Sequence, residues 1–521
     1  MSKRILQFLL ALAACQFGLP LTAYAALAAP TLQVTASSGT CTLSWNSVSG
    51  ANGYDVYRAG NWIQYTNSTS YANTGLTNGT TYSYTVDAQN DTTSPLTVSP
   101  QSASVNCTPG SASSTTYQIV GYYPGWTSGT YPVNSTNINA SHLTLINYAF
   151  LNICWNGVQG NPDPSVNDVI ACQGGALNGA VVLGDYTNDP TNLKNLVALK
   201  SVNPKLKVVA SVGGWSWSNK FSTMANSSTS RTNFINSAVA LVRQYKLDGL
   251  DIDWEYPTNI GVPCTSGNTC QRTTDKQNFV TLVQGLRSAF DSAGSADGKR
   301  YMITIAAGAD ASYVNDPNGS SAWLATLAAS LDWINIMTYD FHGPWDTSSG
   351  FVAPLYRDPN DTSANAATFN SDASVKLFLA TGIAANKLVL GEPFYGYGWA
   401  GCAKGTNGDG LYQACTGAAV GSQDSTFDFA FLTEQGYLTK DANGKYTVGG
   451  KGFARHWNSA SKVPYLYNPS TKVFITYDDE ASIHEKNNYI KSKGLRGGMF
   501  WELNADRNKT LGNVISNDLP H

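Results

Sequence analysis

Three acidic side chains share one face of a short apolar segment that we predict to be a β-strand. The segment runs from Leu247 to Pro257 and carries Asp251, Asp253 and Glu255 at alternate positions. Successive side chains of a strand point to opposite faces, so the three carboxylates lie on one side and the apolar residues between them on the other. Burying unpaired charges is costly, so such a row indicates carboxylates that share protons or act on a ligand. The alternative, a solvated acidic face of an edge strand, fits poorly with the apolar neighbours.

A fourth acid, Asp248, precedes this row and is out of phase with it. We therefore expect Asp248 to cap or bridge the start of the strand rather than to act in catalysis. For the other three, closely spaced carboxylates with different pKa values are typical of an acid/base site.

The overall composition excludes some classes of protein. A chain of 521 residues is long enough for about two to four domains. Charged residues make up only 13% and the formal net charge is -3, which is not the pattern of a nucleic-acid-binding protein. Aromatic residues reach 11%, with 13 Trp and 28 Tyr. This composition suits neutral, flat-faced ligands such as sugars, although aromatic residues in a β-rich core would explain it equally well.

The N-terminus has the features of a secretory signal peptide over residues 1–25. Lys3 and Arg4 precede an apolar run, and a small-x-small site follows at Ala23 to Ala25. The segment from Leu12 to Cys15 resembles a bacterial lipoprotein box, so anchoring through this cysteine is the alternative to secretion. We favour secretion, because the apolar stretch continues to the later site. No other run is long and apolar enough to span a membrane.

Removing the signal peptide leaves eight cysteines, an even number in an exported chain. Their spacing does not match that of metal ligands, and we expect neither a metal nor a cofactor. An oxidising compartment would allow them to pair as disulfides that hold loops. Proximity in the sequence predicts the pairs Cys154–Cys172, Cys264–Cys270 and Cys402–Cys415, which leaves Cys41 with Cys107.

A small all-β domain is predicted over residues 29–108, where short alternating runs are separated by Asn and Gly turns. It resembles a fibronectin type III module, with Trp45 as the early core tryptophan and Tyr82 as the tyrosine-corner residue. A disulfide between its ends departs from that module. For Trp62, an exposed sugar platform is one interpretation, but we favour a core or loop tryptophan. Residues 109–116 are small and polar, and we expect a flexible linker there.

The chain over residues 117–521 alternates apolar, β-branched runs with helix-length stretches. Near-continuous hydrophobic strands indicate a parallel sheet that is covered on both faces. Eight of them predict an α/β fold, a (β/α)8 TIM barrel, in which functional side chains gather at the carboxyl ends of the strands. The predicted strands are Gln118–Tyr123, Leu143–Leu151, Lys205–Val212, Leu247–Trp254, Tyr301–Gly308, Leu331–Tyr339, Lys387–Phe394 and Leu495–Glu502. Between the seventh strand and the last helix, about 400–476 is too long for a loop and is predicted to form a small inserted α+β unit.

The sequence from about Tyr117 to the C-terminus resembles glycoside hydrolase family 18. Four motifs occur in order at the expected strands, so the match is far more specific than any one of them. A segment of the insert also resembles that of bacterial chitinases. The motifs are Ser211–Trp215, Asp248–Glu255, Met337–Phe341 and Gly498–Glu502, and the insert segment is Lys462–Asn468.

The resemblance implies a retaining, substrate-assisted mechanism in which the sugar supplies the nucleophile. Glu255 would be the general acid that protonates the glycosidic oxygen and then the base that activates water. Asp253 would orient the 2-acetamido group, and Asp251 would hold or share its proton. Tyr339 would hydrogen-bond the acetamido oxygen as it attacks the anomeric carbon.

The same resemblance implies a set of substrate-binding residues around the barrel mouth. Asp340 would contact the sugar or tune the acid pair, Trp501 would form an apolar floor, and Met337 would pack beside the pocket. Trp126 would stack a sugar on the non-reducing side. Trp215 and Trp345 would stack sugars on the leaving side. Trp217 and Trp399 are further candidates for this track.

One segment departs from the pattern of similar chitinases. Glu392 stands where an aliphatic residue is usual, and Tyr397 stands where arginine is usual. Glu392 would be either a buried acid with a partner elsewhere or a group that changes the charge of the pocket.

The resemblance therefore predicts a secreted bacterial chitinase that hydrolyses β-1,4-linked N-acetylglucosamine polymers. We expect a monomer whose partners are chitin or chitooligosaccharides. The first alternative is an endo-β-N-acetylglucosaminidase that acts on glycoprotein glycans. The second, from another class, is a non-catalytic chitin-binding lectin, which the presence of Glu255 disfavours.

Overall fold

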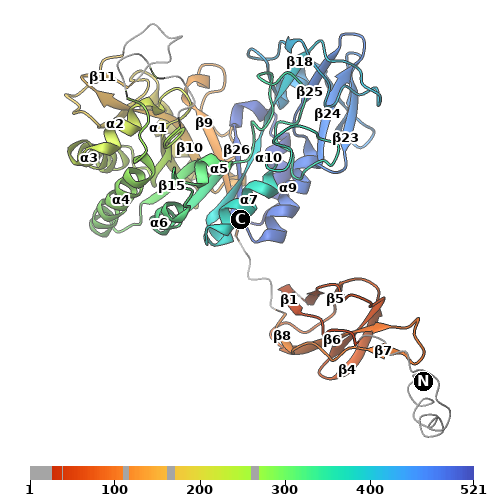
Figure 1. The fold of residues 1–521 in the computed structure, drawn as a ribbon. Helices are drawn as coiled ribbons and strands as arrows, with labels where there is room; N and C mark the ends of the chain where they lie inside the picture. Colours follow the sequence, from red (N-terminus) through yellow and green to blue (C-terminus); the bar gives the residue numbers. More distant parts are fainter. Residues whose placement is uncertain (1–25, 38, 110–115, 161–169, 260–263, 265–268) are drawn as a thin grey trace, which may run out of the picture. The chain divides into compact units, whose positions relative to one another are not determined.

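The computed structural model describes residues 26–37, 39–109, 116–160, 170–259, 264 and 269–521. The chain divides into two compact units, one up to Thr115 and one from Thr116 to His521 (Figure 1). The predicted signal peptide, with its alternative anchor at Cys15, and most of the predicted linker lie outside the described residues.

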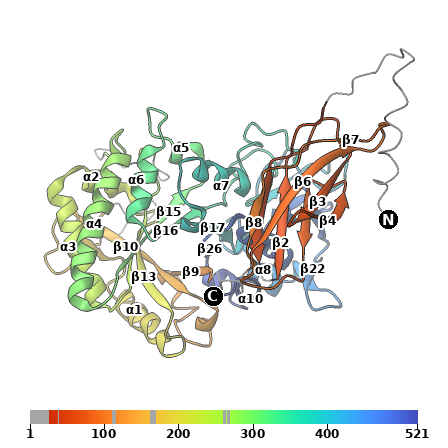
Figure 2. The same ribbon diagram turned by 90° about the horizontal axis from the view of Figure 1, so that it is seen from below.

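The N-terminal unit is a pair of antiparallel sheets packed around one core (Figure 2). One sheet has the order β1-β2-β5, and the other has the order β4-β3-β6-β7, with β8 also pairing with β6. Alternating apolar residues on the inner faces form the core between them. The strands are β1 Leu32–Ser37, β2 Thr40–Trp45, β3 Gly53–Arg58, β4 Asn61–Thr66, β5 Ser70–Asn73, β6 Tyr82–Asn90, β7 Thr97–Val98 and β8 Val105–Cys107.

Three residues named from the sequence lie in this unit. Trp45 is buried against Tyr54, with ring centroids 5.5 Å apart. The hydroxyl of Tyr82 accepts a hydrogen bond of 3.1 Å from the backbone N–H of Thr77. Trp62, however, is 56% exposed and lies on β4, so its assignment to the core or a loop is wrong. Successive side chains of a strand point to opposite faces, and Trp62 lies on the outer face of the sheet, away from the core.

The C-terminal unit is built on eight parallel strands that close into a barrel, which confirms the predicted fold class. Parallel pairing runs in chain order around the barrel, and β9 closes it by pairing with both β10 and β26. The barrel strands are β9 Gln118–Pro124, β10 Leu145–Trp155, β13 Lys207–Gly213, β14 Gly249–Asp253, β15 Met302–Gly308, β16 Trp333–Met337, β17 Leu388–Pro393 and β26 Gly497–Trp501.

Helices surround the barrel on its outer face, as Figure 1 shows for α3, α4, α6 and α9. The α-helices are α1 Asp189–Ala198, α2 Phe221–Asn226, α3 Ser228–Gln244, α4 Asp275–Asp297, α5 Ala311–Val314, α6 Ala322–Ser330, α7 Ser371–Ala380, α9 Glu480–Lys493 and α10 Thr510–Asp518. The short 3-10 turns are Gly125–Thr127, Ala140–His142, Leu199–Ser201, Ser218–Lys220, Ala385–Lys387 and Leu503–Asp506. Among the described residues, no helix is long and apolar enough to cross a membrane.

Strand β10 is longer than predicted, because its end beyond the barrel pairs with two short strands. These are β11 Val158–Gln159 and β12 Val181–Leu183, and both are antiparallel to β10. The extension therefore raises a small wall at the carboxyl end of the barrel.

An antiparallel sheet is inserted between β17 and β26, with the order β19-β18-β25-β24-β23 and with β20 on β18. It starts with β18 at Tyr395, five residues before the predicted beginning at Ala400, because the chain enters this sheet directly from β17. Its elements are β18 Tyr395–Ala400, β19 Gly417–Ala418, β20 Thr426–Asp428, α8 Phe429–Glu434, β21 Leu438–Lys440, β22 Tyr446–Gly449, β23 Ala454–Asn458, β24 Val463–Asn468 and β25 Val473–Thr476.

All four predicted disulfides are present. Three of them close loops of the C-terminal unit, and the fourth joins β2 to β8 in the N-terminal unit. The pairs are Cys41–Cys107, Cys154–Cys172, Cys264–Cys270 and Cys402–Cys415.

Candidate active site

Asp251 lies inside the barrel, completely buried on β14, and is held by three hydroxyl groups from neighbouring strands. Thr304 donates a hydrogen bond of 2.5 Å to its Oδ1. Ser211 and Tyr122 donate to its Oδ2 at 2.8 and 2.9 Å. Burial raises the pKa of Asp251, while these three hydrogen bonds lower it. The sequence singled out the acid but not the hydroxyl groups that hold it.

Asp253, two residues further along β14, is also buried, and its Oδ1 has no hydrogen-bond partner among the described residues. Burial raises its pKa well above the usual range, and the charges of Glu255 and Asp251 raise it further. Asp253 is therefore a protonated or proton-sharing carboxyl with an oxygen available to a ligand.

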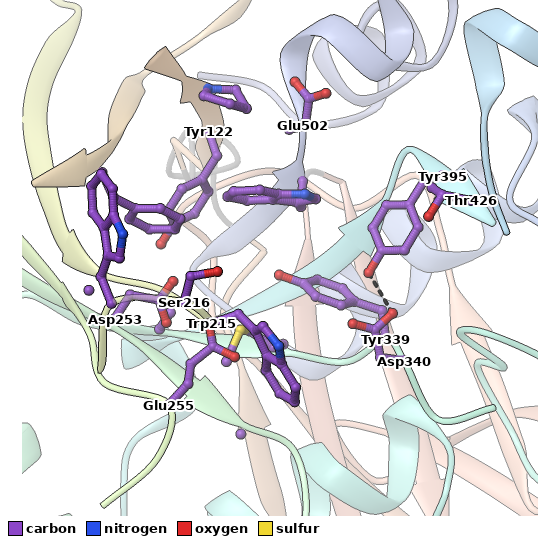
Figure 3. A pocket seen from close by; sticks show the side chains of 18 of the residues that line it. Tyr122, Trp215, Ser216, Asp253, Glu255, Tyr339, Asp340, Tyr395, Thr426 and Glu502 are labelled. Carbon is purple, nitrogen blue, oxygen red and sulfur yellow. Dashed lines mark hydrogen bonds between the residues drawn. The ribbon is translucent and has the colours of Figure 1, made fainter. Parts of the chain in front are cut away.

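Glu255 follows the strand, and burial raises its pKa to about 7. A hydrogen bond from Tyr256 lowers this pKa, and the charge of Asp340 raises it. Asp253 and Glu255 lie on one side of the pocket, and Tyr339 and Asp340 lie on the opposite side (Figure 3). A carboxyl group with a pKa near neutrality can both give and take a proton at working pH.

The backbone at the end of β14 is fixed by the neighbouring β13 segment. The N–H of Glu255 donates to Ser218 Oγ at 2.8 Å, and this oxygen lies 3.1 Å from the carbonyl oxygen of Asp253. Gly213 has a φ of +108°, and a Cβ there would lie 2.3 Å from the same carbonyl. Only glycine tolerates both the conformation and the close approach, so this residue allows β13 to support the acid row.

Tyr339 and Asp340 follow β16 and face the acid row. Tyr339 is half-buried, with its hydroxyl 3.9 Å from the sulfur of Met499, and its loss of solvent in the pocket raises its pKa well above the usual range. Asp340 Oδ1 accepts a hydrogen bond of 2.6 Å from Tyr395, drawn in Figure 3, and Tyr397 also hydrogen-bonds Asp340. Tyr397 thus binds an acid of the pocket, which no pattern in the sequence indicated.

Trp501, at the end of β26, forms part of an aromatic cluster at the base of the pocket. Its ring is stacked against Phe150, with centroids 5.7 Å apart and an interplanar angle of 16°. Tyr122 and Trp126 lie 5.5 and 6.2 Å from it. Met337 lies in the adjoining interior cluster, so it packs beside the pocket. A flat apolar surface beside carboxylates suits a sugar ring, which is apolar on its faces and polar at its edge.

The pocket is a groove of about 1610 Å³ that extends well beyond the acids. Trp126, Trp215 and Trp345 line it and are 63%, 54% and 57% exposed. Trp217 also lines the groove and is half-buried. Trp399 is fully buried in the insert and donates its N–H to the carbonyl of Asp346, so its suggested place in the groove is wrong. Its side chain packs within the insert instead.

The insert contributes polar groups to the groove, among them Gln423, Thr426 and Asp428. Glu502 completes the lining near Trp501, and burial raises its pKa to about 8. Glu502 belongs to the motif Gly498–Glu502, but the sequence predicted no role for this residue. The insert residues carried no recognisable signal, since only folding brings β20 beside β18.

The other two acids discussed from the sequence are Asp248 and Glu392, and both lie away from the groove. Asp248 accepts hydrogen bonds from Lys200 at 2.5 Å and from the N–H of Val208 at 2.7 Å, so it bridges the start of its strand. Glu392 is fully buried and faces the helix layer, where it neighbours Gly498 and Ile490 on α9. Burial raises its pKa well above the usual range and so favours its neutral form, and its place outside the groove separates it from the charge of the pocket.

A (β/α)8 barrel with carboxylates at the end of a strand and an aromatic groove above them is typical of a glycoside hydrolase. The model of glycosyl hydrolases family 18 matches residues 118–506, and the chain belongs to this family.

Individual relatives agree with this assignment. Chitinase A1 of Niallia circulans is 46% identical over 431 residues, which cover 78% of this chain and 58% of that protein. The chain thus spans little more than half the length of that relative. Chitinase 1 of Aphanocladium album is 32% identical, with 74% of this chain and 81% of that protein covered. Among solved structures, chitinase ChiA74 from Bacillus thuringiensis has a TM-score of 0.69 at 37% identity, with coverage of 78% and 70%.

Proposed function

We propose that the protein is a chitinase that hydrolyses β-1,4 bonds between N-acetylglucosamine residues. The observation that carries this proposal is the position of Glu255, a buried acid with a pKa of about 7, beside the available oxygen of Asp253 in a long aromatic groove. The chitinases of Niallia circulans and Aphanocladium album support the choice of substrate.

In the proposed mechanism, protonated Glu255 gives its proton to the glycosidic oxygen as the bond to the anomeric carbon breaks. The acetamido oxygen of the same sugar forms the new bond to that carbon, which yields an oxazolinium ion. Asp253 accepts a hydrogen bond from the acetamido N–H and stabilises its positive charge, and Asp251 supports Asp253. The hydroxyl of Tyr339 orients the acetamido oxygen.

In the second half of the reaction, Glu255 is a carboxylate and takes a proton from water as the water attacks the anomeric carbon. The acetamido group is released, and the configuration is retained after two inversions. Trp501 provides the floor under the reacting sugar. Asp340, held by Tyr395 and Tyr397, faces the acids and supports the protonated state of Glu255.

The exposed tryptophans of the groove are proposed to bind further sugars of a linear polymer. Trp126 would stack a sugar on the non-reducing side, and Trp215 and Trp345 would stack sugars of the leaving portion. Their high exposure supports this role, because ring faces covered by packing could not receive a ligand.

Three further proposals concern the whole chain. We infer secretion, supported by the four disulfides and the signal-like N-terminus. We infer that the N-terminal unit is a fibronectin type III module, supported by its two sheets, the buried Trp45 and the hydrogen bond of Tyr82. We also infer that the protein acts as a monomer.

The experiment that tests the proposed function compares four substrates. We expect release of sugars from chitohexaose and from insoluble chitin, and none from a high-mannose glycopeptide. Fully deacetylated chitosan should not be cleaved, because it lacks the acetamido nucleophile. Cleavage of the glycopeptide alone would support the endo-β-N-acetylglucosaminidase alternative, and binding without cleavage would support a lectin.

A further inference from the structure

Four tryptophans of the described chain are more than half exposed, and three of them line the groove. The fourth is Trp62, which is 56% exposed, and it lies in the N-terminal unit. Its exposure falls within the 54–63% range of Trp126, Trp215 and Trp345. Single exposed apolar side chains are common on protein surfaces, so the inference depends on how the Trp62 ring is held and on which groups adjoin it.

Trp62 is also held in place. Its indole N–H donates a hydrogen bond of 2.6 Å to Oδ1 of Asp55, a buried acid on the adjacent strand β3. This bond ties the nitrogen edge of the ring to the sheet, so the exposed part of the indole is its carbon surface. A fixed ring loses little conformational entropy when a ligand stacks on it.

Polar groups adjoin the ring on the same face of the sheet. Trp62 pairs with Tyr57 on β3, and Tyr57 pairs with Thr85 on β6, so the three side chains form a row across the sheet. The hydroxyl of Thr85 donates to the exposed amide of Gln101 at 2.9 Å. Tyr57 itself is buried, so the accessible groups are the Trp62 ring at the edge-strand end and the Thr85–Gln101 pair at the other.

The charges of this face select among ligands. Asp55 pairs in register with Asp87, and Tyr65 lies across from Asp55 and near Asp91. Asp55 and Asp87 are buried, so they act on this face through their negative charge, which disfavours polyanions such as nucleic acids and acidic glycans. Asp91 is exposed and can accept hydrogen bonds from hydroxyl and amide N–H groups. A neutral polymer of sugars that carry both groups meets these requirements.

From these observations we propose that the outer face around Trp62, Thr85 and Gln101 is a second binding site for chitin, separate from the groove. This inference rests on the proposed function only for the identity of the sugar. The site would attach the enzyme to insoluble substrate, and it would have no part in bond cleavage.

The test is adsorption of the full-length protein to insoluble chitin. Glu255→Gln is the background, so that the substrate is not consumed, and Trp62→Ala is added to it. We expect the adsorption constant to fall about tenfold, the loss typical of truncating a main aromatic anchor. Trp62→Tyr should retain most of the binding. Leu96→Ala, which removes another exposed apolar side chain of the same unit, is the matched control and should have no effect.

Two further measurements separate this proposal from the proposed function. In the active protein, Trp62→Ala should leave the hydrolysis of chitohexaose unchanged and slow the release of sugar from insoluble chitin. The melting temperature should fall slightly, because Asp55 loses one hydrogen bond, but the protein should stay folded under the assay conditions since Trp62 lies outside the core. Equal adsorption of Trp62→Ala and its background, or an equal loss with Leu96→Ala, would overturn the second site. Failure of the wild type to cleave chitohexaose would overturn the proposed function instead.

Discussion

At the scale of residues, the three acids on one strand differ because their surroundings differ. Asp251 accepts hydrogen bonds from three hydroxyl groups, whereas one oxygen of Asp253 has no partner among the described residues. Glu255 stands outside the strand and faces Asp340 across the pocket. Spacing alone predicted a row of carboxylates, but the hydroxyl groups that distinguish them come from β9, β13 and β15, far apart in the sequence.

The pH dependence of activity should report the pKa of the Asp253 and Glu255 pair. Because Glu255 must start protonated, we expect kcat/KM to fall on the alkaline side with an apparent pKa of about 7. The charge of Asp340 raises this pKa, so Asp340→Asn should move the alkaline limb to lower pH. Rates on chitohexaose across the pH range provide the measurement.

A control for this shift is Asp424→Asn, which removes one negative charge from an exposed turn of the insert. It should leave the alkaline limb in place. An unchanged limb in Asp340→Asn would show that Asp340 does not support the protonated state of Glu255.

At the scale of elements, strand β17 carries a buried acid, Glu392, that takes no part in the proposed reaction and does not contribute to the charge of the groove. Val389 on β17 faces the barrel interior, whereas Glu392 faces α9, where burial keeps it neutral. The nearby charges, Lys486, Asp478 and Asp518, act on its pKa in opposite directions. The sequence showed the unusual residue, but only the register of β17 shows which face it occupies.

This burial makes stability depend on pH. The pKa of Glu392 is raised above its ordinary value of 4.5, so its contribution is fully present below that pH and is lost as pH rises through the folded-state pKa. Glu392→Gln removes the ionisable group and keeps the shape. We expect similar melting temperatures at pH 5, and a higher one for the variant at pH 9. Glu485→Gln, which removes a partly exposed acid from α9, is the control and should show no such difference. Equal pH profiles for wild type and Glu392→Gln would contradict the effect of burial on Glu392.

The elements themselves could be predicted well from the sequence, since each barrel strand lies within a largely apolar run. Their ends were less certain. The run at Leu143–Leu151 was predicted to stop where the apolar pattern weakens, but β10 continues to Trp155 because β11 and β12 pair with it. The insert begins at Tyr395 for a related reason, since β18 pairs with β20 and β25, which follow much later in the chain.

At the scale of the molecule, chemistry and attachment to substrate fall to separate units. The acids, the aromatic floor and the groove are all formed by residues beyond Thr116. Trp62 and its row belong to the other unit. The sequence could not show this division, because the exposure of a tryptophan depends on which face of a strand it occupies.

Deletion of residues 26–116 tests this division of roles. We expect unchanged rates on chitohexaose, because every groove residue is retained, and a loss on insoluble chitin similar to that of Trp62→Ala. A large loss on the soluble hexamer would contradict the independence of the C-terminal unit. A larger loss on insoluble chitin than Trp62→Ala causes would indicate that other residues of the N-terminal unit also bind.

The most direct test of the central claim is the turnover of chitohexaose by Glu255→Gln. The variant keeps the shape and hydrogen-bonding capacity of the side chain but cannot give its proton to the glycosidic oxygen. We predict that kcat falls by about 10²–10⁴-fold or more, the contribution typical of a general acid. The melting temperature and the binding of the hexamer should be retained. Rates like those of the wild type in a folded, sugar-binding Glu255→Gln protein would contradict the role of Glu255 and the mechanism built on it.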